Sequence, residues 1–145
     1  MRRAIFLLFI LLLGAPALPA PAEEGAALPP ADAAAIRKVI EDQIAAFRSD
    51  DGTRAFSYAS PVIQDRFRTP ENFMEMVRTA YPQVYRPRGL EFHGLADSQQ
   101  GPIQEVIVTG PDGVPVMALY VMERQPDGSW KINGCYLARI PDESA

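Results

Sequence analysis

Cys135 is the only cysteine of the 145-residue chain, and it lies in the segment DGSWKINGCYLARI beside the only tryptophan, Trp130. A cysteine becomes nucleophilic when a cation, a histidine or a helix N-terminus lowers its thiol pKa. Lys131 lies four residues away on an extended segment and no helix start is near, so nothing here lowers that pKa. The pattern favours a small packing residue over a catalytic thiol. A lone cysteine forms no internal disulfide, so stability must come from packing.

Two orientations are open for this segment, which alternates apolar and polar residues as a strand does. Strict alternation from Trp130 places every second residue up to Tyr136 on the inner face and Cys135 on the outer face. A bulge at Gly134 would shift the pairing by one residue and turn Cys135 and Leu137 inward instead. Both orientations make the segment the closing strand of a sheet.

Glu105 is the first candidate for a general base. In PIQEVIVT it shares a strand face with Ile103 and Ile107. If that face lines an interior, desolvation raises the carboxyl pKa to a value suited to base catalysis. If Val106 and Val108 face inward instead, Glu105 is a solvated charge. The second alternative is favoured, because burying a carboxylate without compensation is costly.

His93, the only histidine, is the second candidate base. In LEFHGLA it points the same way as Glu91, so the pair could supply two metal ligands. A metal site needs at least one more ligand, and the sequence marks none. We therefore interpret His93 as a partly exposed strand residue, and we expect no metal and no cofactor.

Four residues at the join between the helical and stranded halves are the candidate ligand-binding set. They are Tyr81, Tyr85, Arg86 and Arg88, within YPQVYRPR. Arginine forks bind anions such as carboxylates, so the set could form the rim of a pocket. The alternative is an extended Tyr-Pro and Arg-Pro connection whose arginines lie in water.

The N-terminus has the organisation of a secretory signal peptide: MRR, then the apolar AIFLLFILLLGA, then PALPAPA. The apolar run is shorter than the roughly 20 residues of a membrane span, so an uncleaved anchor is the less favoured alternative. We expect cleavage after Ala22 and a periplasmic or secreted protein. Removing Arg2 and Arg3 leaves 12 Lys+Arg against 18 Asp+Glu, a formal charge of −6. This charge argues against nucleic acid and anionic membranes as partners of the mature chain.

Helical periodicity then covers the first half of the mature chain. After a flexible spacer at 23–32, Asp32 is the expected N-cap of a helix with apolar residues from Ile36 to Phe47. TRAFSYAS reads as a short second helix. Two further helices are expected to start at Ser60 and Thr69, each a hydroxyl N-cap followed by proline at the first helical position.

After residue 88 the helical spacing of apolar residues gives way to the alternation of apolar and polar residues that is typical of strands. We expect strands near 89–97, 102–109, 115–124 and 129–139, with the turns GPDGVP and QPDGSW joining antiparallel neighbours. Helices followed by strands predict an α+β fold, in which the helices pack on one face of a curled four-stranded antiparallel meander. The predicted single domain covers residues 33–141, followed by a tail at 142–145.

The third predicted strand, VPVMALYVME, has apolar residues on both of its faces, whereas antiparallel strands usually have one apolar and one polar face. Both of its faces must therefore be covered. The second face is covered either by a second subunit, which would make the protein a homodimer, or by a strongly curled sheet.

AAFRSDDGTRAFSYAS, followed by a sheet ending in DGSWKINGCYL, resembles the nuclear-transport-factor-two-like superfamily. That resemblance implies the cystatin-like cone shared with ketosteroid isomerase and scytalone dehydratase. More narrowly, SPVIQDRFRTPENFMEMVRTAYPQVYRPR with WKINGCYL resembles a family of secreted bacterial proteins known as a domain of unknown function, over residues 33–140.

The superfamily contains enzymes, ligand binders and interaction modules, so the resemblance implies no reaction. We expect an exported, non-catalytic domain that binds a small amphipathic ligand or a protein partner. The alternative is a small isomerase or dehydratase that uses Glu105 or His93 as its base. A buried acid–base pair in a shared cavity would distinguish the two.

Overall fold

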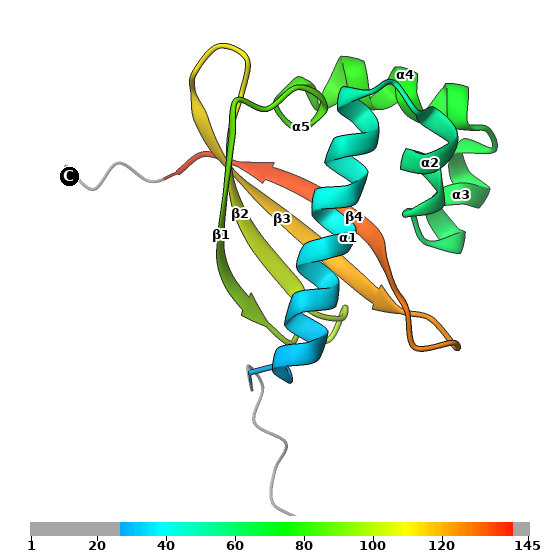
Figure 1. Cartoon of the computed structure of the whole chain (residues 1–145), viewed down its shortest axis with the longest axis vertical. Coiled ribbons are helices and arrows are strands. Elements are labelled where there is room, and N and C mark those ends of the chain that lie inside the picture. Colours follow the sequence, from blue (N-terminus) through cyan, green and yellow to red (C-terminus); the bar gives the residue numbers. More distant parts are fainter. Residues whose placement is uncertain (1–26, 141–145) are drawn as a thin grey trace, which may run out of the picture.

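The computed structural model describes residues 27–140, so the predicted signal peptide, residues 23–26 of the predicted spacer and the tail lie outside the described residues. The end of the predicted spacer was wrong, because residues 30–32 already belong to the first helix. Helices occupy the first half and strands the second (Figure 1). The helices are α1 (Pro30–Arg48), α2 (Gly52–Ser57), α3 (Pro61–Phe67), α4 (Pro70–Ala80) and α5 (Pro82–Tyr85). The strands are β1 (Gly89–Ala96), β2 (Ile103–Thr109), β3 (Pro115–Arg124) and β4 (Trp130–Ala138). The α+β prediction is confirmed. None of the helices in this part of the chain has the length and apolar composition of a membrane span.

The starts of α3 and α4 follow the predicted capping chemistry. The hydroxyl of Ser60 accepts a hydrogen bond from the backbone N–H of Ile63, and that of Thr69 accepts one from Asn72. A proline occupies the first position of each helix, where its missing N–H costs nothing. These two helix starts are therefore set by local sequence alone.

The predicted start of α1 was wrong. The helix begins at Pro30, so Pro29 and not Asp32 occupies the N-cap position. The carboxylate of Asp32 instead accepts a hydrogen bond from Nε1 of Trp130 at 3.3 Å and pairs with Arg124 at 2.6 Å. The side chain that the local pattern assigned to a helix cap thus bonds to the β3–β4 hairpin, which is distant in sequence.

YPQVYRPR, for which an extended connection was one of the two alternatives, contains the single helical turn α5. Pro82 starts this turn, because its fixed φ suits a first helical position. The turn buries Val84 against the core. The chain therefore enters the sheet through a compact corner and not through an extended linker.

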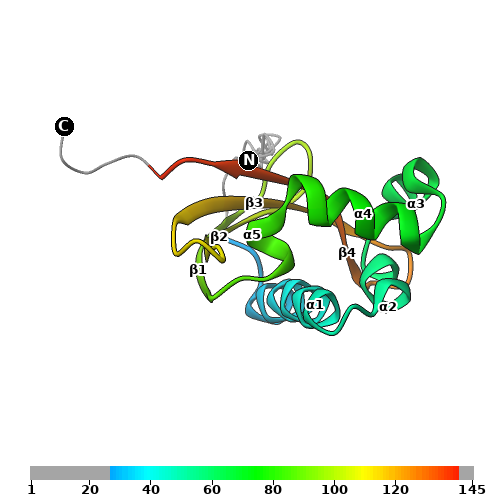
Figure 2. The same cartoon turned by 90° about the horizontal axis from the view of Figure 1, so that it is seen from above.

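The sheet is a meander of order β1-β2-β3-β4 with every pair antiparallel, and it is not closed into a barrel. Both Pro-Asp-Gly turns end on a glycine with positive φ, at Gly113 and Gly128. The helices all lie against one face of the sheet (Figure 2).

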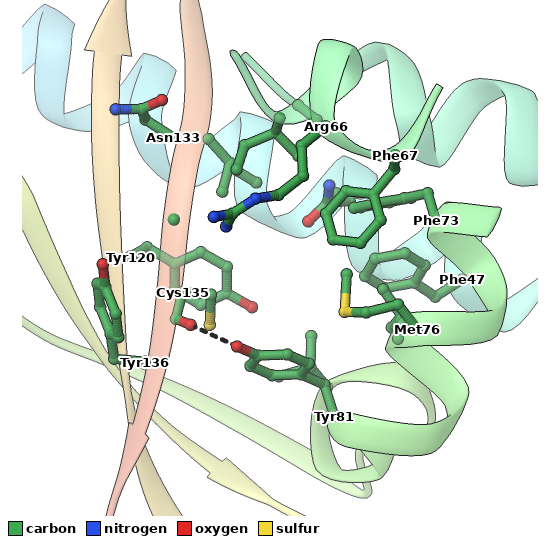
Figure 3. A pocket seen from close by; sticks show the side chains of 17 residues that line it. Phe47, Arg66, Phe67, Phe73, Met76, Tyr81, Tyr120, Asn133, Cys135 and Tyr136 are labelled. Atoms are coloured by element: carbon green, nitrogen blue, oxygen red, sulfur yellow. Dashed lines mark hydrogen bonds between the residues drawn. The ribbon is translucent and has the colours of Figure 1, made fainter. Parts of the chain in front are cut away.

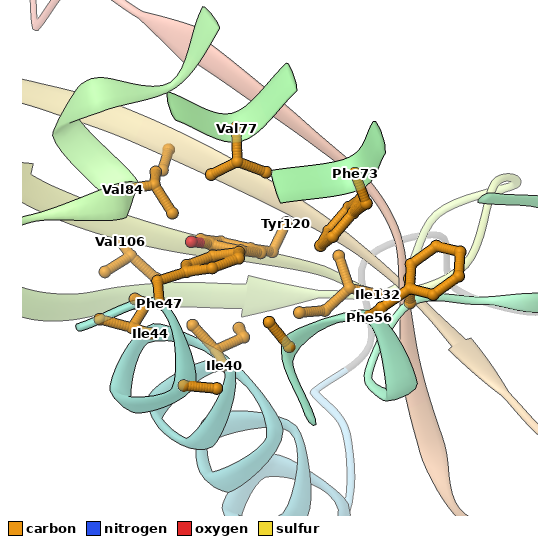
Figure 4. Close-up of a cluster of buried hydrophobic side chains, with 14 of the residues drawn as sticks. Ile40, Ile44, Phe47, Phe56, Phe73, Val77, Val84, Val106, Tyr120 and Ile132 are labelled. Carbon is orange, nitrogen blue, oxygen red and sulfur yellow. The ribbon is translucent and has the colours of Figure 1, made fainter. Parts of the chain in front are cut away.

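The core lies between the helices and this inner face. Ile40, Ile44 and Phe47 of α1 belong to the same buried cluster as Val106, Tyr120 and Ile132 of the sheet (Figure 4). Phe56, Phe73, Val77 and Val84 complete it from the shorter helices.

The outer face of the sheet holds the second set of apolar side chains of β3. Met117, Leu119 and Val121 alternate with the inward-facing residues of that strand. Their cross-strand partners are largely apolar and include Ile103, Ile107 and Tyr136. No helix or strand formed by residues 27–140 covers this face (Figure 2), where Met117 and Leu119 are partly exposed and Val121 is buried.

Candidate functional site

A cavity of about 190 Å³ lies between the helices and the β4 side of the sheet (Figure 3). Side chains from α1, α3, α4, α5, β3 and β4 line it, so no single segment of the sequence contains the site. Its walls are mainly apolar: Phe47, Ala59, Ile63, Phe67, Phe73, Met76, Val77, Val84 and Ile132. Its polar groups come from Gln43, Arg66, Tyr81, Tyr120, Asn133 and Cys135.

A β-bulge in β4 decides which of its side chains enter this cavity. Met122 of β3 pairs with Ile132, whereas the preceding Val121 pairs with Gly134, so Asn133 is the extra residue. Ile132 and Cys135 consequently both face the cavity, although strict alternation would place them on opposite faces. Of the two predicted orientations, the structure has the bulged one, centred one residue before Gly134.

Hydrogen bonds from the α2–α3 connection hold the bulge. The Ser60 hydroxyl donates to Oδ1 of Asn133 at 2.7 Å. The backbone N–H of Ser60 donates to the carbonyl of Ile132, and the N–H of Ile132 donates to the carbonyl of Tyr58, both at 2.9 Å. Ser60 is fully buried and also caps α3. One side chain therefore connects the start of a cavity-lining helix to the irregular point of the strand.

Tyr120 and Cys135 form the inner end of the cavity from adjacent strands. Tyr120 is only 1 % exposed, and its hydroxyl has no hydrogen-bond partner. The Cys135 thiol lies close enough to influence it, but not in the geometry of a hydrogen bond. Burial, with a contribution from the thiol, raises the Tyr120 pKa well above its ordinary value. The hydroxyl is therefore a neutral donor that points into the cavity (Figure 3).

The environment of Cys135 keeps its thiol protonated. Cys135 is partly exposed as a whole residue, yet burial of the thiol raises its pKa to about 12. The neighbouring Tyr120 hydroxyl only partly opposes this rise in pKa. A thiol that stays protonated at neutral pH is a poor nucleophile. The structure thus places Cys135 in a pocket wall, as a small polarisable group.

Tyr81 is the member of the predicted ligand-binding set that lines the cavity. Its hydroxyl donates to the backbone carbonyl of Cys135 at 3.0 Å and so joins the end of α4 to β4 (Figure 3). Burial raises the pKa of this hydroxyl. Its proton is committed to the carbonyl, and its oxygen can still accept a hydrogen bond.

Arg66 is a cavity residue that sequence reasoning missed. It extends from α3 across the cavity toward β4 (Figure 3). It forms no ion pair or hydrogen bond with the part of the chain that the structure describes. Ile63, Arg66 and Phe67 are three and four residues apart on α3, so they share one helix face. That spacing was the available signal, but it does not show that the face borders a cavity.

The other three members of the predicted set lie outside the cavity lining. Tyr85 and Arg86 gather around Asp50, in the turn after α1. The Tyr85 hydroxyl donates to the Asp50 carboxylate, and Arg86 pairs with that carboxylate at 2.9 Å. The Tyr85 hydrogen bond, followed by the charge of Arg86, lowers the Asp50 pKa. Arg88 is exposed at the start of β1, where its backbone N–H donates to Thr109.

Glu105 and His93 lie on the outer side of the sheet, away from the cavity. Glu105 is exposed on β2, where Gln104 and Val106 are the inward-facing neighbours. His93 is exposed and bonds to Glu91 at 2.9 Å. Within residues 27–140, no group of three or more His, Cys, Asp and Glu side chains could hold a metal ion.

Comparison with known proteins gives one match. A family model described as Domain of unknown function (DUF4864) matches residues 29–145. No curated protein and no solved structure matches the chain. The matched range starts at α1 and includes every element that lines the cavity.

Proposed function

The chain belongs to the DUF4864 family, and we propose that its domain is a non-catalytic module that binds one small amphipathic molecule in the cavity. The observation that carries this proposal is the composition of the walls, which combine continuous apolar surface with a few polar groups at separate points. This is the usual composition of small-molecule sites, in which apolar contacts supply affinity and polar groups fix orientation.

The volume of the cavity sets the size of the molecule. At about 190 Å³ it is somewhat larger than a ~150 Å³ apolar cavity that takes up benzene, and smaller than the roughly 300–1,000 Å³ of drug-sized pockets. A single ring or a short branched chain matches this volume. A sterol or a long acyl chain does not.

The protonation of the polar lining supports binding over catalysis. Burial raises the pKa values of Tyr81, Tyr120 and Cys135, so all three keep their protons at neutral pH. They act there as hydrogen-bonding groups and not as bases or nucleophiles. The isomerase or dehydratase alternative relies on Glu105 or His93, and both lie on the other side of the sheet.

A pocket between helices and the inner face of a curled sheet is also what the resemblance to the nuclear-transport-factor-two-like superfamily implies. We therefore propose that wider relationship as well. Export by the N-terminal segment belongs to the same proposal, because a binding module without a reaction fits a role in capturing a small molecule outside the cytoplasm.

The proposal is tested by filling the cavity. Ile63→Trp places a large ring in the lining, whereas Val62→Trp places the same ring on the adjacent residue, which is 65 % exposed. Benzyl alcohol, used as a neutral one-ring probe, should raise the Tm of the wild type and of Val62→Trp. It should leave the Tm of Ile63→Trp unchanged, since a ligand stabilises only the state that binds it.

Equal Tm shifts in all three proteins would place the probe elsewhere and contradict the proposal. If benzyl alcohol and a panel of other one-ring molecules leave the wild-type Tm unchanged, the cavity is not a ligand site. A protein partner would then be the better hypothesis for this domain.

A further inference from the structure

We infer that the ligand of this cavity is a one-ring aromatic acid that carries a hydrogen-bonding oxygen at its buried end. The inference rests on the binding function proposed above and adds the chemical class of the ligand. Three separate features of the cavity lead to it: the aromatic walls, the Tyr120 hydroxyl at the inner end, and the exposed Arg66, which extends across the cavity toward β4.

The walls favour a planar ring over an aliphatic chain. Phe73 packs against Phe47 with ring centroids 6.1 Å apart, and against Phe67 at 5.8 Å in an edge-to-face arrangement. All three rings line the cavity. Aromatic rings prefer such tilted contacts with one another, so a ligand ring gains packing energy from the same geometry. The volume of about 190 Å³ leaves room for one ring and its substituents.

The inner end requires a hydrogen-bond acceptor. The Tyr120 hydroxyl is buried, has no partner, and points into the cavity. A buried hydroxyl without a partner costs free energy. The Tyr120 oxygen exposes less than 1 Å², so a ligand oxygen that removes this cost must push aside the side chains around it. The Tyr81 hydroxyl lies at the backbone carbonyl of Cys135, the residue opposite Tyr120 in the sheet register, and its oxygen has a free lone pair. A ligand hydroxyl could therefore accept from Tyr120 and donate to Tyr81. A purely apolar ligand would leave Tyr120 unsatisfied.

The other recognition point is cationic. Among the lining residues that the structure describes, Arg66 alone carries a charge at neutral pH. Its neighbour Asp65 is exposed and lies outside the lining, so the guanidinium is not neutralised from within its own helix. A guanidinium fork matches a carboxylate with two parallel hydrogen bonds. A ligand whose ring fills the cavity would thus hold a carboxylate against Arg66.

Four probes separate these recognition points by calorimetric titration. They are para-hydroxybenzoate, which has both groups; benzoate, which lacks the inner oxygen; methyl para-hydroxybenzoate, which lacks the charge; and benzyl alcohol. We expect para-hydroxybenzoate to bind the wild type about fivefold more tightly than benzoate, as one added hydrogen bond provides. It should bind about tenfold more tightly than its methyl ester, as a charge-assisted pair provides, and this second advantage should shrink as salt is added.

Two substitutions, one that removes a single oxygen atom and one that removes a single charge, show which residue causes each difference in affinity. Tyr120→Phe removes only the unpartnered hydroxyl, so the variant should fold at least as stably as the wild type. It should lose the preference for para-hydroxybenzoate over benzoate. Arg66→Gln should lose the preference for the acid over the ester and keep the affinity for benzyl alcohol. Tyr58→Phe and Arg68→Gln, which change the same residue types outside the cavity lining, should retain both preferences.

The outcomes distinguish this inference from the function on which it rests. If benzyl alcohol binds in the cavity but the acid has no advantage over its ester, or Arg66→Gln does not remove that advantage, the acid class is wrong and the binding function remains. If the hydroxyl advantage persists in Tyr120→Phe, the inner recognition point is wrong. If none of the four probes binds, both the inference and the proposed function are overturned.

Discussion

Tyr120 of β3 stands directly opposite Cys135 of β4 in the sheet register, and both side chains point into the same cavity. The pair exists because the bulge at Asn133 turns the end of β4 inward. It places two protonated polar groups at the inner end of a mainly apolar site. The reactivity of the thiol, the stability of the bulge and the contents of the cavity are therefore linked.

The first prediction concerns the pH dependence that Cys135 introduces. Burial raises the thiol pKa from an ordinary 9.0 to about 12, so the folded state keeps a proton that the unfolded state loses in this interval. The contribution of the protonated thiol to the free energy of unfolding is fully present below pH 9 and is lost as the pH rises toward 12. Between these values the free energy of unfolding should fall more steeply with pH in the wild type than in Cys135→Ala, by up to about 1.4 kcal/mol per pH unit.

The same comparison has a simpler control at neutral pH. Cys135→Ala should remain folded, with a loss of about 1 kcal/mol for truncating a small buried side chain. A thiol reagent should label the folded wild type slowly and the unfolded chain rapidly. Rapid stoichiometric labelling of the folded protein at neutral pH would contradict the pKa direction and restore the hypothesis of a reactive thiol.

The second prediction concerns the hydrogen bond that holds the bulge. Ser60→Ala removes both the cap of α3 and the donor to Asn133 from a fully buried position. The loss should be about 1–3 kcal/mol in the free energy of unfolding, measured by urea denaturation. Ser57→Ala, which removes an exposed hydroxyl that donates to Arg54, should cost less than about 0.5 kcal/mol. Equal effects of the two changes would mean that the bulge does not depend on Ser60.

The third prediction concerns acid stability. The Tyr85 hydrogen bond and the Arg86 charge lower the Asp50 pKa below its ordinary 3.8. A lowered carboxyl pKa contributes stability that is present above pH 3.8 and is lost as the pH falls through the folded-state pKa. Asp50→Asn should lower the Tm at neutral pH and make it less dependent on pH in the acid range. Asp65→Asn, outside this cluster, should leave the acid profile unchanged, and a similar flattening in that variant would refute the assignment.

The fourth prediction concerns the outer face of the sheet. We propose that two copies associate through it, because a twisted sheet packs well on another sheet at about 10 Å and Met117 and Leu119 are left partly exposed on this face. Light scattering at micromolar concentration should give twice the mass of one chain. Leu119→Lys should give a single-chain mass, whereas Val114→Lys, in the exposed β2–β3 turn, should not. A monomeric wild type would show that this face stays uncovered.

The fifth prediction concerns the N-terminal segment, which lies outside the described residues. We propose export with cleavage after Ala22, because Ala20 and Ala22 fill the two small-residue positions of a signal-peptide site. The intact mass of protein recovered from the periplasm or the medium should correspond to a chain that begins at Glu23. A full-length mass in the membrane fraction would instead indicate an anchor.

The sequence by itself determined the elements whose signals are local. Ser60 and Thr69, each followed by proline, marked two helix starts because a cap bonds within three residues of its own position. The Pro-Asp-Gly turns and the alternation of apolar residues marked the ends of the strands to within about two residues, because these signals too lie within a few neighbouring positions. From these elements the α+β class and the order of the meander followed without any long-range contact.

Only the tertiary structure decided how those elements use their side chains. Asp32 bonds to Trp130 rather than capping its own helix, and Asn133 bulges because Ser60, 73 residues earlier, donates to it. The site itself combines Arg66, Tyr81 and Tyr120 from three separate elements, so no window of sequence contains its pattern. Local rules fix hydrogen bonds between residues near in sequence. The cavity depends on which residues are near in space, and that is set only when the helices pack against the sheet.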